Sequence, residues 1–108
     1  MRNKSKKWAE VEEKILAAVE RGKAAGVDLV FGSFGWYKPG GKCCALSMVV
    51  GDEYAYDVVN TSAEKLGITR NQAWEIAFAF DAAPRLPLTA AGRVGRDLRL
   101  KLQPPKAY

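Results

Sequence analysis

Histidine is absent from the 108 residues of this chain. Its absence excludes a Cys–His or Ser–His catalytic pair, a His-ligated metal site and an imidazole pH switch. The two cysteines, Cys43 and Cys44, are adjacent, which suits neither an unstrained disulfide nor a four-ligand zinc site. We therefore expect no metal, no cofactor and two free thiols in a reducing, cytoplasmic compartment. The alternative is a reactive thiol favoured by Lys42.

Long apolar runs are also missing, because no stretch approaches the roughly 20 residues that span a bilayer. The N-terminus begins Met1-Arg2-Asn3-Lys4 and continues into charged residues, so a secretory signal is not expected. With 48% hydrophobic residues, the chain has enough apolar side chains for one packed core. The sequence predicts a single domain over 1–108, with a basic arm at 1–7 and a tail at 103–108.

The net charge of +5 is unevenly distributed. Residues 1–25 hold seven Lys or Arg against four Glu, residues 26–83 hold four against seven acidic residues, and residues 84–108 hold six against one. An acidic middle is thus flanked by two basic ends. Basic ends attract nucleic acid or an acidic partner, and they also keep a small protein in solution.

Helical periodicity is clearest in residues 5–25, where Trp8 and Ile15 lie on one apolar face and Gly26 is placed to end the helix. The next segment, 27–42, breaks this period with four glycines and one proline. It predicts a short strand at Val30–Phe31 followed by a glycine-rich loop or small hairpin. Gly41-Lys42 precedes a cysteine, so the spacing excludes a phosphate-binding P-loop.

Residues 43–60 suit either strand or helix, and we favour helix on both sides of Gly51-Asp52. Two capping-box tetrapeptides, at 61–64 and 69–72, predict two helix starts separated by Gly67, with the second helix running to about residue 83. The offsets also fit a DNA-binding helix-turn-helix. However, the second helix offers few donors for base edges, so a structural helical hairpin is the better interpretation.

The last helix is predicted from Thr89, with Ala91, Val94, Leu98 and Leu102 on its apolar face. A strand over 97–103 is the rival interpretation. Together these segments predict a mainly α fold: a small helical bundle with a short β-hairpin or glycine-rich loop insertion. An α+β fold is the alternative.

The middle of the chain also carries a resemblance. A tryptophan-bearing glycine loop, a Cys-Ala-Leu step, the pattern A-x-x-L-G-[IL]-[ST]-x-x-Q-x-W-x-I and a closing Phe-Asp resemble small uncharacterised proteins of bacteria and their phages. The residues that carry this resemblance lie within 30–83 and are Trp36, Cys44-Ala45-Leu46, Ala63, Leu66-Gly67-Ile68-Thr69, Gln72, Trp74, Ile76 and Phe80-Asp81. Ser47 departs from it, since a glycine is expected there. The resemblance implies a mainly helical fold and no particular activity.

The remaining acidic, basic, tyrosine and cysteine residues stand at no spacing that predicts an active site, so we expect no enzyme. The first hypothesis is a protein-binding module, such as a phage or mobile-element accessory factor that binds a host protein or itself. Its expected anchors are aromatic residues, which dominate interface energies: Trp36, Tyr37, Trp74 and Phe78. The alternative is nucleic-acid binding through phosphate contacts from Lys4, Lys6, Lys7, Arg93, Arg96, Arg99 and Lys101.

Overall fold

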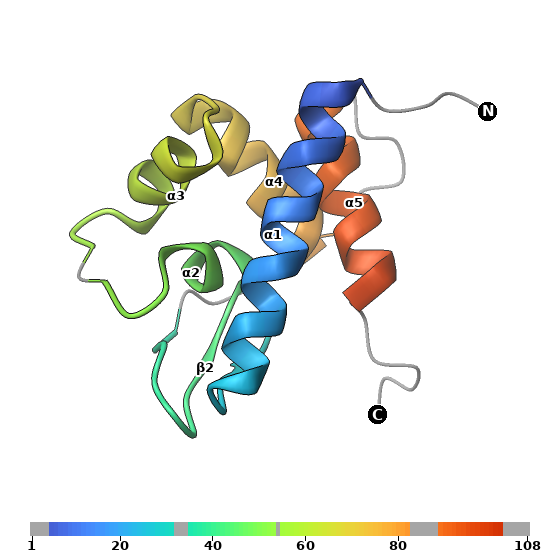
Figure 1. Ribbon diagram of the computed structural model, residues 1–108. Helices are drawn as coiled ribbons and strands as arrows, with labels where there is room; N and C mark the ends of the chain where they lie inside the picture. The colour runs from blue at the N-terminus through green and yellow to red at the C-terminus, as the bar shows by residue number, and fades with distance from the viewer. Residues whose placement is uncertain (1–4, 32–34, 54, 83–88, 103–108) are drawn as a thin grey trace.

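The computed structural model describes residues 5–31, 35–53, 55–82 and 89–102, and they form a mainly helical fold with a small two-stranded sheet (Figure 1). This confirms the predicted fold class. The elements in chain order are α1 (Lys6–Ala24), β1 (Asp28–Leu29), β2 (Lys42–Cys43), α2 (Ala45–Val50), α3 (Val58–Leu66), α4 (Arg70–Ala82) and α5 (Ala90–Leu102). No helix among these residues is long and apolar enough to cross a membrane.

Helix α1 begins and ends where its sequence predicts. The Ser5 hydroxyl caps it by accepting a hydrogen bond from the Trp8 backbone N–H. Gly26 follows the helix with φ of +86°, a left-handed conformation that glycine adopts without strain. The apolar face of α1 buries Ile15 and Val19 completely. In Figure 1, α1 runs past α2 on one side and α5 on the other, and it packs against both.

The two strands are parallel, with Asp28 opposite Lys42 and Leu29 opposite Cys43. Of the two predicted forms of this insertion, the structure therefore adopts a glycine-rich loop that links parallel strands. What remains of a hairpin is one antiparallel bridge between Gly35 and Cys43. Strand β2 thus pairs with β1 through Lys42 and Cys43, and Cys43 also pairs with Gly35, so the buried Cys43 joins both ends of the loop.

The segment between α2 and α3 corrects two predictions. Residues 51–57 are not helical where the structure describes them, and Tyr56 is 94% exposed. Helix α3 starts at Val58 rather than at the predicted capping box, because the Asp57 carboxylate accepts the Asn60 backbone N–H and caps the helix one turn earlier. The tetrapeptide at 61–64 consequently lies inside α3.

The capping box at 69–72, in contrast, is confirmed in both of its bonds. The Thr69 hydroxyl accepts the Gln72 backbone N–H at 3.1 Å, and the Gln72 side chain accepts the Thr69 backbone N–H at 3.0 Å. Gly67, with φ of +72°, ends α3 and turns the chain into α4. The predicted helical hairpin is therefore formed by α3 and α4.

Helices α4 and α5 pack along each other more extensively than any other pair of elements. Thr89 caps α5 by accepting the Gly92 backbone N–H at 2.9 Å, and Val94 and Leu98 are fully buried, which confirms the predicted helix and excludes a strand there. Gly95 faces the backbone of α4. A Cβ at this position would lie closer to the Ile76 carbonyl oxygen than 3.0 Å, a separation that real Cβ atoms essentially never show.

Replacing Gly95 with alanine tests this close approach, because helix propensity and packing predict opposite changes in the free energy of unfolding. Helix propensity alone favours Gly95→Ala by about 0.5–1 kcal/mol. The clash with α4 predicts instead a loss of about 1–3 kcal/mol in the free energy of unfolding, typical of overpacking. Urea unfolding followed by circular dichroism measures the difference. A stabilised variant would contradict the packing described here.

Candidate functional site

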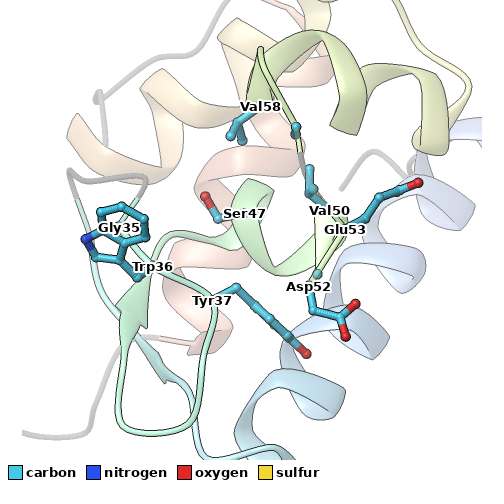
Figure 2. Close-up of a pocket in the computed structure, with 10 residues that line it drawn as sticks. Gly35, Trp36, Tyr37, Ser47, Val50, Asp52, Glu53 and Val58 are labelled. Carbon is cyan, nitrogen blue, oxygen red and sulfur yellow. The ribbon is translucent and has the colours of Figure 1, made fainter.

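A groove of about 400 Å³ lies between the glycine-rich loop, the end of α2 and the start of α3 (Figure 2). One wall is the loop, and the other is the turn that follows α2. Val58 lies at the start of α3, and Ser47 comes from α2. The residues that line the groove are Gly35, Trp36, Tyr37, Ser47, Val50, Gly51, Asp52, Glu53, Ala55 and Val58.

Backbone hydrogen bonds hold the loop wall in place. The Trp36 N–H donates to the Lys42 carbonyl at 2.8 Å, and the Gly40 N–H donates to the Gly26 carbonyl at 2.8 Å, which ties the loop to β2 and to the end of α1. Gly35 is required by this arrangement, since its φ is +62° and a Cβ there would collide with the Lys42 carbonyl. The loop wall is thus fixed by its main chain.

The two adjacent rings of this wall have different environments. Trp36 is 74% exposed, whereas Tyr37 is half-buried and packs against the hydrophobic core. In Figure 2 the Trp36 ring stands at one end of the groove, and Tyr37 extends from the loop toward the side of Asp52. The groove therefore combines one exposed aromatic surface with one anchored ring.

The opposite wall follows from the end of α2. Gly51 ends this helix with φ of +75°, and its N–H donates to the Ser47 carbonyl at 2.9 Å. The next two residues, Asp52 and Glu53, are exposed and line the groove. A helix that ended later would not place these two carboxylates opposite the loop.

The electrostatics of the lining are acidic. Among the lining residues that the structure describes, Asp52 and Glu53 are the only charged ones. Glu53 forms an exposed salt bridge with Lys65 at 2.8 Å. Just outside the lining, the Asn60 backbone N–H and the guanidinium of Arg70 lower the pKa of Asp57 by stabilising its charged form.

Of the four predicted aromatic anchors, the structure brings two together. Trp36 and Tyr37 line the groove. Trp74 and Phe78 lie on α4, one helical turn apart and 44% and 62% exposed, and they are not part of the lining. Sequence reasoning missed the wall formed by Asp52 and its neighbours, for which Gly51-Asp52 as a helix-ending turn was the available signal.

The seven predicted phosphate-contacting residues have mixed placements. Lys4 lies outside the described residues, while Lys6, Lys7 and Arg93 are exposed. Arg96 and Arg99 are half-buried, and Lys101 forms a salt bridge with the buried carboxylate of Glu12. Arg99 is therefore turned toward the core of the fold and not toward solvent.

Arg99 folds back onto the core because α4 ends beside it. Its guanidinium donates to the carbonyls of Phe80 and Asp81 at 2.8 and 2.6 Å. The same group lies 4.4 Å from the centre of the Phe31 ring, a cation–π contact. The last carbonyls of a helix lack partners within it and attract cations, so Arg99 serves as a cap for α4.

The two thiols are buried rather than reactive. Burial raises the pKa of Cys43 to about 11, and the neighbouring Cys44 adds to the increase. Burial also raises the pKa of Cys44, against hydrogen bonds from Ser47 and Leu46 that lower it. Within the described parts of the chain, no group of three or more cysteine and acidic side chains could hold a metal ion.

No protein-family model, curated protein or solved structure matches this chain.

The buried thiols are expected to react slowly with a disulfide reagent. A pKa of about 11 instead of 9.0 lowers the thiolate fraction of Cys43 at pH 8 by about a hundredfold, because each unit is a factor of ten. The absorbance of the thionitrobenzoate released from dithionitrobenzoate should rise slowly for the folded protein, and two equivalents should be released rapidly in denaturant. Rapid labelling of the native protein would contradict burial.

The free energy of unfolding should fall as the pH rises from about 9 toward about 11. The thiol of Cys43 has a lower pKa in the unfolded chain than in the fold, so deprotonation in this range favours the unfolded state.

Arg99→Ala is expected to destabilise the fold by about 1–3 kcal/mol, since it removes two charge-assisted hydrogen bonds and a cation–π contact. Arg93→Ala on the same helix is the matched control, because Arg93 is exposed, and its effect should stay within about 0.5 kcal/mol. Urea unfolding of both variants measures the difference. Equal stabilities would show that Arg99 does not cap α4.

Proposed function

We propose that this protein is a non-enzymatic protein-binding module whose binding surface is the groove beside Trp36. The observation that carries the proposal is the exposure of Trp36 on a loop fixed by main-chain hydrogen bonds. A large ring held in one place loses little conformational entropy when a partner covers it. Tryptophan is also among the residues that contribute most to binding energy at protein interfaces.

The size of the groove favours a short segment of the partner over a broad surface. About 400 Å³ is within the range of pockets that enclose small ligands or a few side chains. The loop wall and the turn after α2 face each other across it (Figure 2), so an extended peptide would contact both. We therefore favour recognition of a peptide segment.

The polar groups of the lining favour binding over catalysis. Ser47 is a buried hydroxyl whose hydrogen-bonding neighbour is the Cys44 thiol at 3.7 Å. That thiol has a raised pKa, so it does not activate Ser47 as a base would. The acidic side chains of the opposite wall are exposed, and one of them is held by Lys65.

Nucleic acid fits this groove less well than a peptide. Bases that stacked on Trp36 would bring phosphates toward the carboxylates of Asp52 and Glu53. Two of the basic residues proposed for phosphate contacts, Arg99 and Lys101, already have partners inside the fold. Both observations favour a protein partner.

Selection of a displayed random peptide library on the immobilised protein tests this function. We expect enriched peptides whose affinity, measured by fluorescence anisotropy, falls at least about tenfold in Trp36→Ala, as for an aromatic hot spot. Because the Trp36 side chain is mostly exposed, the melting temperature of this variant should change little.

Leu100→Ala is the matched control, since Leu100 is a large apolar side chain that is 68% exposed and lies outside the groove. Its peptide affinity should equal that of the unmodified chain. The proposal fails if no peptide is enriched, or if the enriched peptides bind Trp36→Ala as tightly as the unmodified protein.

A further inference from the structure

The geometry points to the chemistry of the occupant: we infer that the groove binds a peptide segment that carries an arginine or lysine, with the basic head beside Asp52. This inference rests on the proposed function and specifies its partner. It assigns the two walls different tasks, apolar contact at the loop and charge recognition at the turn after α2.

Charge complementarity is the first argument. Every formal charge among the described residues of the lining is negative, although the whole chain has a net charge of +5. The charge of the groove is therefore opposite in sign to the net charge of the whole chain, and it agrees with the acidic middle of the sequence, residues 26–83. Acidic peptide side chains would meet like charges at Asp52 and Glu53, and a wholly apolar segment would desolvate these carboxylates without compensation. A cationic side chain avoids both costs.

Asp52 is the better of the two carboxylates for this contact. Glu53 already has Lys65 at 2.8 Å, whereas no salt bridge of Asp52 occurs in the described parts of the chain. Asp52 is also exposed, so a ligand can reach it without displacing another cation. In Figure 2, Tyr37 extends toward the side of Asp52, so a ring borders the space that the basic head would occupy.

The aromatic residues suit the rest of such a side chain. Arginine and lysine have apolar stems that pack on rings while the charged head stays near water. Among the described residues, cation–ring contacts occur between Arg99 and Phe31 at 4.4 Å and between Lys7 and Trp8 at 5.1 Å. Trp36 is the exposed ring in the groove that remains available to a partner.

The experiment uses the peptides selected on the intact protein. Among those whose binding depends on Trp36, we expect arginine or lysine at one recurrent position. Replacing that residue with citrulline or norleucine, which remove the charge and retain much of the stem, should weaken binding about three- to tenfold, as expected for one partly exposed ion pair with a ring contact.

Asp52→Asn should weaken binding of the same peptides to a similar extent and should reduce the preference for the charged residue over its neutral replacement. Glu13→Gln is the matched control, because it removes the same charge from an exposed site on α1 outside the groove. It should leave the affinity unchanged.

The outcomes separate the two proposals. Peptides that depend on Trp36 but carry no recurrent basic residue would overturn the inference and leave the proposed function standing. Equal affinity of the charged and neutral peptides, or equal effects of Asp52→Asn and Glu13→Gln, would also overturn it. Failure to obtain any Trp36-dependent peptide would remove the proposed function and this inference together.

Discussion

The close contact between α1 and α2 at Gly22 is the constraint on which the groove depends. A Cβ at Gly22 would collide with the Met48 sulfur and would lie 3.4 Å from the Tyr37 ring. The missing side chain thus lets one face of α1 hold both α2, which leads into the acidic wall, and Tyr37, which belongs to the loop wall. Because both walls pack on the same helix, their separation is set by the core.

The loop that carries Trp36 is anchored at several independent points. Before the loop, the Phe31 ring packs 4.6 Å from Phe80 and beneath the Arg99 guanidinium. After it, β2 is buried at Cys43 and holds the loop through backbone bonds. A tryptophan on a mobile loop would have to be ordered on binding, whereas these contacts order it beforehand.

Sequence periodicity predicted the long helices because each presents an unbroken apolar face, but it could not assign single side chains near the surface. Trp36 and Tyr37 are adjacent rings in one glycine-rich segment, and only the pairing of the loop with β2 decides which one packs inward. Likewise, a helical projection places Arg99 among solvated arginines, whereas its long side chain reaches the carbonyls that end α4. The turn at Asp52 was missed because its role comes from the loop that it faces.

The net positive charge of the chain does not prevent recognition of a basic segment. At about 0.1 M ionic strength, exposed charges are screened over roughly 10 Å, a shorter distance than the 12.9 Å radius of gyration of this molecule. Charges farther than this from the groove therefore have little influence on a side chain inside it. The carboxylates of the lining act over one contact distance, where screening is weak, so the local charge determines which partner is accepted, and the net charge influences mainly how fast the partner approaches.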